Sequence, residues 1–165
     1  MNQAGRRIAA LRRARSRRER MEADLRAVLE ARRREHAELQ ARAGEAEASV
    51  ARLDTIARDH RERIAGMMTG SEPFSIDIFE ACRRYLEIVD AQLGEAQAAL
   101  QACVDAVAAK AGEMAAARCA IALNRGRIDV CRDRAKQLEK SLDQIAADAE
   151  DEAAEELALA RRAHV

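Results

Sequence analysis

The residues best suited to metal chemistry are scattered along the chain. Four cysteines and three histidines occur among 165 residues, and no two cysteines have CxxC spacing. The histidines, His36, His60 and His164, lie far apart in the sequence. A structural zinc site needs four closely spaced ligands of these types. We therefore expect no metal and no cofactor.

Catalytic groupings are equally hard to find. The seven glycines are isolated from one another, so no phosphate-binding loop is visible. The adjacent acids Glu150, Asp151 and Glu152 would point in different directions from a helix. Aromatic residues make up only 2% of the chain, which leaves little to build a ligand pocket or to stack on bases. We expect a protein without enzymatic activity.

The distribution of charge is more informative. The net formal charge is zero, yet residues 1–20 hold eight arginines and one acid, whereas residues 139–165 hold eight acids and three basic residues. Clustered arginines can neutralise phosphates, but acids interleave from Glu19 onward, so we do not expect nucleic acid as the partner. The charged residues predicted to bind a protein partner are Arg6, Arg7, Arg12, Arg13, Arg17, Arg20, Glu150, Asp151 and Glu155.

Two long helices must carry these charges. Steps of three and four residues define one seam over residues 8–67 and another over residues 79–159. Large apolar residues fill 22 of the 42 seam positions but only 9 of the 99 positions between them. This period of 3.5 residues is typical of a left-handed coiled coil. Three of the four cysteines fall on the seam, where they serve as small apolar residues.

The seam is interrupted once, where the chain has its single cluster of glycine, proline, serine and threonine. Gly66 or Gly70 can end the first helix in the left-handed conformation, and Pro73 cannot lie inside a helix. Ser75 is placed to cap the second helix, with Phe74 and Phe79 spaced as a hydrophobic staple. We predict one domain, residues 1–165, with helices at about 4–68 and 76–162 and a turn at about 69–75.

The two seams fit each other as an antiparallel pair within one chain. Opposite residues have numbers that add up to 146, so Leu53 meets Leu93 and Leu25 meets Ile121. The same register aligns two polar layers, His36 with Lys110 and Glu22 with Asn124. Such layers commonly fix the register of a coiled coil. We predict an all-α fold, an antiparallel intramolecular coiled-coil hairpin; the alternative is that each helix pairs with another copy.

This register leaves residues 146–165 without a partner in the chain. The seam becomes acidic there, at Glu152 and Glu156, while Arg15 and Arg18 occupy the seam of the first helix nearby. One interpretation is that these are solvated ends whose opposite charges attract each other. The other is that they form a surface that receives a polar partner and is steered to it by charge. No apolar run could cross a bilayer and no secretory signal follows the basic start, so we expect a cytoplasmic protein.

The basic start at Arg6–Arg20, the long first helix, the turn near Gly70–Ser75 and the longer second helix resemble one known group. They are similar to the type III secretion stalk proteins of the FliJ and YscO group, and most of all to its Hrp-type branch. The resemblance covers the whole chain, but that group has no sharp motif from which functional residues could be carried over.

The resemblance implies a stalk similar to the coiled-coil part of a rotary ATPase shaft. Its expected partners are a hexameric secretion ATPase, the export gate in the membrane and recycled secretion chaperones, and its expected location is the cytoplasm or the cytoplasmic face of the inner membrane. Such a stalk would couple ATP hydrolysis to protein export. The alternative is a structural adaptor or a chaperone-escort coiled coil.

Overall fold

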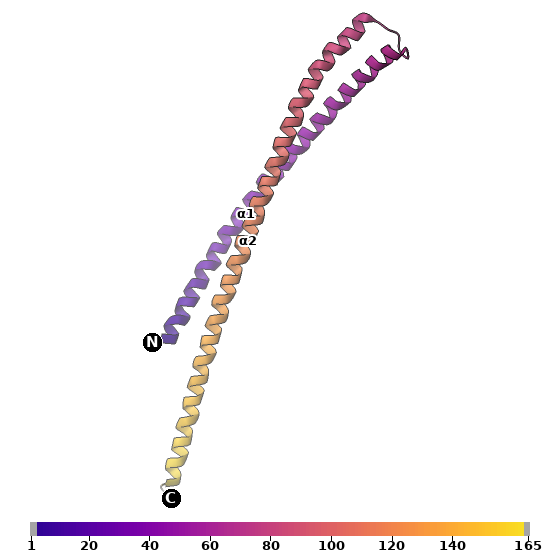
Figure 1. Cartoon of the computed structure of the whole chain (residues 1–165). Helices are drawn as coiled ribbons and strands as arrows, with labels where there is room; N and C mark the ends of the chain where they lie inside the picture. The colour runs from indigo at the N-terminus through magenta and orange to yellow at the C-terminus, as the bar shows by residue number, and fades with distance from the viewer. Residues whose placement is uncertain (1–2, 164–165) are drawn as a thin grey trace. The chain divides into compact units, whose positions relative to one another are not determined.

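A computed structural model describes residues 3–163, and these form two helices joined by one short turn (Figure 1). Helix α1 spans Gln3–Thr69 and helix α2 spans Ile76–Ala163. The two helices pack against each other in opposite directions, and the described residues include no strand. The predicted all-α helical hairpin is therefore confirmed, with helix bounds within a residue of those expected from the heptad pattern.

The packing of α1 on α2 divides into two compact units. The first unit contains α1 up to Leu29 and α2 from Ala117 onward, and the second contains Glu30–Ala116 with the turn. The first unit ends at Leu29 on α1 and at Ala117 on α2, two residues that the predicted register places opposite each other. Contacts between the helices agree with the predicted register: Arg125 pairs with Glu22 in the first unit, and Lys110 pairs with Glu35 in the second.

The heptad seam is the core of both units. Every seam position of α1 from Ile8 to Met67, and of α2 from Phe79 to Leu142, is buried or half-buried. The seam residues with the lowest exposure lie in the second unit, where Val89 is 1% exposed and Ala57 is fully buried. A helix has one buried stripe because its apolar side chains return to the same side every three and four residues.

Helix α1 ends at a glycine in the left-handed conformation. Gly70 has a φ of 79°, a value that a residue with a Cβ atom adopts only with strain. The backbone N–H of Glu72 donates to the carbonyl oxygen of Gly66 at 3.1 Å, and the Ser71 hydroxyl donates to the same oxygen at 3.2 Å. These bonds provide donors to a carbonyl in the last turn of α1, where the helix runs out of N–H groups of its own. Of the two glycines predicted to end the helix, Gly70 takes that role.

Helix α2 begins directly after Ser75. The N–H of Phe79 donates to the Ser75 carbonyl oxygen at 2.9 Å, which is the first hydrogen bond of the helix. The rings of Phe74 and Phe79 lie 5.9 Å apart, so the predicted hydrophobic staple is present. Two of the three aromatic residues therefore fix the angle at which the chain enters α2.

The polar layer of the second unit is built differently from the predicted pair of His36 and Lys110. The Lys110 ammonium pairs with Glu35 at 2.8 Å and with Glu113 at 2.9 Å, and Arg32 pairs with the same two carboxylates. The hydrogen bond from Lys110 lowers the pKa of Glu35, and the bond to Glu35 raises the pKa of Lys110. A cation on the seam gains more from carboxylates on both helices than from an imidazole.

The polar layer of the first unit contains Glu22 and Asn124, as predicted, but the two do not bond to each other. Asn124, only 4% exposed, donates from Nδ2 to the backbone oxygen of Arg18 at 3.0 Å. Glu22 accepts from Arg125 at 2.7 Å and from Arg26 at 2.6 Å. The bond to Arg125 is the main cause that lowers the pKa of Glu22. Both layers thus link α1 to α2 through polar groups that favour one register.

Candidate partner-binding surfaces

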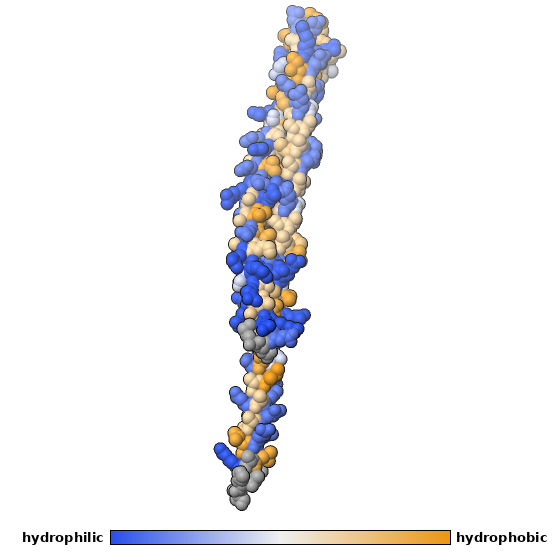
Figure 2. Space-filling view, turned by 90° about the vertical axis from the view of Figure 1, so that its left-hand side faces the viewer, coloured by the Kyte–Doolittle hydropathy of each residue, from blue (hydrophilic) through white to orange (hydrophobic). Residues whose placement is uncertain are grey.

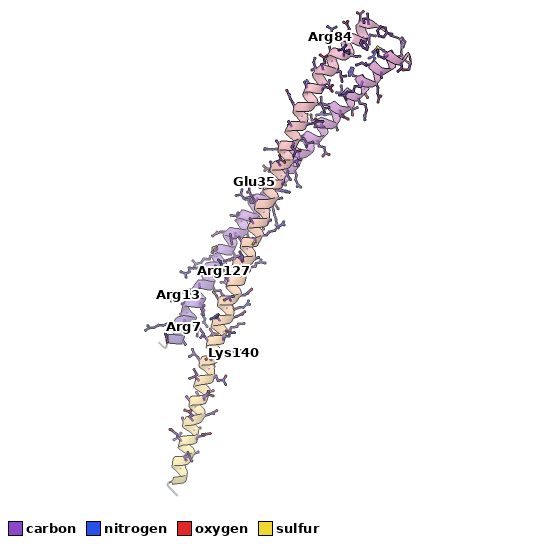
Figure 3. All side chains as sticks on the ribbon, in the orientation of Figure 1. Arg7, Arg13, Glu35, Arg84, Arg127 and Lys140 are labelled. Carbon is purple, nitrogen blue, oxygen red and sulfur yellow. The ribbon has the colours of Figure 1, made fainter. Side chains whose placement is uncertain are left out.

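The arginines near the start of α1 form one exposed surface, here called the arginine face. Heptad positions such as Ile8 and Leu11 face α2, so the residues between them face solvent. Figure 3 shows two members, Arg7 and Arg13, along the same part of the first unit as Arg127 and Lys140 of α2. All the arginines predicted from the sequence as binding residues are exposed: Arg6, Arg7, Arg12, Arg13, Arg17 and Arg20.

Most of these arginines are not engaged by a carboxylate. Arg12 pairs with Glu139 of α2 at 2.8 Å, with the Arg12 side chain 68% exposed. An ion pair this open to water contributes little stability. Among the described residues no carboxylate lies within ion-pair distance of Arg7 or Arg17. The arginine face therefore carries positive charge that the chain itself leaves largely uncompensated.

The last part of α2 forms the second surface, residues 143–159, here called the acidic tail. It holds seven acids and no basic residue, a net charge of −7. The predicted binding residues Glu150, Asp151 and Glu155 are among them, and all are exposed. Ile145 and Leu159 continue the seam but are 62% and 65% exposed, because no helix of this unit lies opposite them. Figure 2 shows this segment as a narrow part of the surface where apolar and charged side chains alternate.

The structure does not bring the acidic tail and the arginine face together within one chain. Helix α2 continues in a straight course past the start of α1, so the tail leads away from the arginines (Figure 1). Among the side chains that the structure describes, no acid of the tail forms an ion pair, and the partner of Arg12 is Glu139, which precedes the tail. Attraction between the two charged ends of the same chain, one interpretation of the sequence, is supported by a single contact, the exposed ion pair between Arg12 and Glu139.

A groove between α1 and α2 adds a feature that the sequence analysis missed, here called the arginine groove. Its apolar floor includes Leu11 and Leu138, and three arginines stand around it. The full lining is Arg7, Ala10, Leu11, Ala14, Arg17, Arg134, Gln137 and Leu138. Arg134 immediately precedes the seam residue Ala135, so it borders the line of contact between the helices. This position next to the seam was the signal that could have revealed Arg134 as part of the groove.

A second groove in the first unit is more apolar. Leu123 and Val130 line it and are 59% and 60% exposed, with Gly126 between them. Arg18 borders this groove, together with Cys119 of α2. Leu123 and Val130 are one heptad apart and lie off the seam, which is the pattern of an additional contact stripe. In the sequence, both belong to the nine large apolar residues between seam positions, and their spacing of one heptad was the signal that they share a face.

The described residues form no cluster of metal-ligating side chains. In the second unit His60 lies against Tyr85 with ring centroids 4.8 Å apart, and its Nδ1 atom is buried without a hydrogen-bond partner. Across residues 3–163 no group of three histidine, cysteine, aspartate or glutamate side chains is close enough to hold a metal ion. His164 lies outside the described residues. None of the described helices is long and apolar enough to cross a membrane.

Fold and surface together define a two-helix antiparallel coiled-coil protein with a basic face and an unpartnered acidic tail. Residues 6–162 match the family described as "Bacterial type III secretion protein (HrpB7)". Because the match covers nearly the whole chain, the chain belongs to this family and is a type III secretion component. The Hrp-type resemblance seen in the sequence is thereby confirmed. Neither a curated protein nor a solved structure matched the chain.

Proposed function

We propose that this protein is the central stalk of a type III secretion export apparatus, similar to FliJ and YscO. In this role it has no catalytic activity and links the hexameric secretion ATPase to the export gate, coupling ATP hydrolysis to protein export from the cytoplasmic side of the inner membrane. The family supplies the secretion context. The observation that carries the stalk role is the acidic tail, a long single-helix extension of a two-helix coiled coil.

The surfaces at this end suit a shaft inside a ring. A shaft must bind its ring without being locked in one position, and polar contacts that form and break in water allow this better than a large apolar interface. The tail presents acids and the arginine face presents cations, and both are exposed. The same polar surfaces would suit transient contacts with secretion chaperones.

The test is binding to the secretion ATPase and its effect on the rate of hydrolysis. The full chain is expected to co-purify with the ATPase ring and to raise its ATPase rate. Removal of residues 146–165 is expected to weaken this contact and to leave the helical content of the hairpin unchanged. The matched control replaces the same segment with an equally long helix of alanine and glutamine, which keeps length and helicity but removes the charge.

Two results would contradict the proposal in different ways. A folded full-length chain that neither binds the ring nor changes its ATPase rate would favour the adaptor or chaperone-escort role. An unchanged affinity after removal of the tail would place the ring-binding surface elsewhere on the hairpin. Genes for a secretion ATPase and a stator subunit next to the gene for this protein would support the stalk role.

A further inference from the structure

The acidic tail and the arginine groove are complementary surfaces that one chain cannot bring together. The tail carries a net charge of −7, and residues 6–20, which border the groove, carry eight arginines and one acid, a net charge of +7. The tail belongs to a continuous helix that leads away from the groove. Contact between them therefore requires two molecules, unless α2 breaks.

We propose that the acidic tail of one copy binds in the arginine groove of a second copy. The groove offers an apolar floor at Leu11 and Leu138 and positive charge at Arg7, Arg17 and Arg134. The tail offers exposed apolar side chains at Ile145 and Leu159, with Glu152 and Glu156 between them on the same seam. A helix that presents acids and apolar side chains on one face can lie in an apolar groove with a cationic border, where its acids meet the arginines.

The groove is shorter than the tail and is long enough for about ten of its residues. The tail of 17 residues is about 25 Å long, and the groove runs along α1 from Arg7 to Arg17, about 15 Å. When two open ends meet, each tail runs alongside the start of the other copy's α1. Both contacts then form at once, related by a two-fold axis, as in most homodimers.

Pairing of the two tails with each other explains the exposed seam less well. It would place seven acids of one copy beside seven acids of the next, and like charges at close range oppose association. Binding in the groove instead pairs each tail with arginines that have no carboxylate partner in their own chain. Charge complementarity therefore favours binding of the tail in the groove of a second copy over pairing of two tails.

The test compares charge-reversed full-length chains by sedimentation velocity. The wild-type chain is expected to dimerise at about 100 µM or below at low salt and to lose at least about tenfold in affinity in 0.5 M salt, because salt screens exposed charges. The tail variant Glu150→Lys, Asp151→Lys, Glu155→Lys and the groove variant Arg7→Glu, Arg17→Glu, Arg134→Glu should each be monomeric alone. Mixed together they should form a heterodimer, because the unchanged acidic tail of the groove variant meets the unchanged groove of the tail variant, and the three new lysines meet the three new glutamates.

A matched control makes the same change of charge in the second unit, with Glu38→Lys, Glu45→Lys and Asp54→Lys, and should dimerise like the wild type. Circular dichroism establishes that every variant keeps its helical content. The proposal is overturned if the wild-type chain stays monomeric at low salt, if dimers survive charge reversal of the tail, or if the mixed variants fail to associate. A monomeric chain whose groove variant loses binding to the secretion ATPase would assign the groove to that partner instead.

Discussion

Replacing Val89 with alanine probes the most deeply buried large side chain of the hairpin. Val89 is 1% exposed, and the residue that the register places opposite it, Ala57, is fully buried. The change removes two carbons from the core, a loss of about 1.6 kcal/mol at about 0.8 kcal/mol per buried methylene, and more where a cavity remains. Alanine returns up to about 0.6 kcal/mol through its higher helix propensity. We expect a net loss of about 1–2 kcal/mol in the free energy of unfolding.

Val104 provides the matched control, because it has the same side chain on the same helix in the same unit. It is 46% exposed, so Val104→Ala forfeits only about half of the transfer free energy. The gain in helix propensity offsets most of this loss, and the expected change is within about 0.5 kcal/mol of zero. Urea denaturation followed by circular dichroism at 222 nm measures both. Equal changes at the two positions would refute the view that the seam, rather than helix propensity, stabilises the hairpin.

Three further predictions follow from the turn, the glycines and the polar layer. Gly94→Ala should stabilise by about 1 kcal/mol in urea denaturation, because a Cβ there meets no atom within 4 Å, whereas Gly70→Ala should destabilise because φ is positive. Phe79→Ala should speed amide exchange at the start of α2, through loss of its contact with Phe74. The pKa of Glu35 is lowered in the folded state, so this carboxylate stabilises the fold above its ordinary pKa of 4.5, and the stabilisation is lost as pH falls below that value. Glu35→Gln should therefore flatten the acid side of a plot of Tm against pH.

Each of these three has an outcome that would count against it. An unchanged or lower urea midpoint in Gly94→Ala would contradict the first prediction. Gly112→Ala, at another open helical position, is the parallel measurement. Unchanged exchange at the start of α2 in Phe79→Ala would show that the staple is dispensable. A Tm profile of Glu35→Gln that keeps the wild-type slope below pH 4.5 would assign the acid sensitivity to other carboxylates, beginning with Glu22, whose pKa is also lowered.

The helices and the turn could be predicted because their signals are local. The period of the seam depends on the geometry of one helix, and it correctly identified which side of each helix would be buried. Pro73 and the neighbouring glycines marked the only interruption, and the spacing of Phe74 and Phe79 gave the staple. The register could also be predicted, since apolar and polar seam positions had to coincide across the pair.

The partners of long charged side chains could not be predicted in the same way. The register places Lys110 in one layer with His36 but does not name the partners of its amine, which are Glu35 and Glu113, because a flexible side chain selects the nearest carboxylates on either helix. The arginine groove was missed because Arg134 reaches it from α2, more than a hundred residues along the chain from Arg7. The heptad spacing places Arg134 beside the contact line, but it does not show that Arg134 and Arg7 border one groove until the helices are packed.

By itself, the sequence determined that two helices pair along a heptad seam, that the chain turns at Gly70–Ser75, and that α2 extends beyond the start of α1. These properties follow from the heptad period and from the helix-ending residues of the turn, and both signals act over a few residues. The tertiary structure alone decided which arginines remain unpaired, and that Leu11, Leu138 and Arg134 join in one groove. The physical reason is that a surface between two helices is formed by side chains from both, and its shape and charge exist only once those helices are in contact.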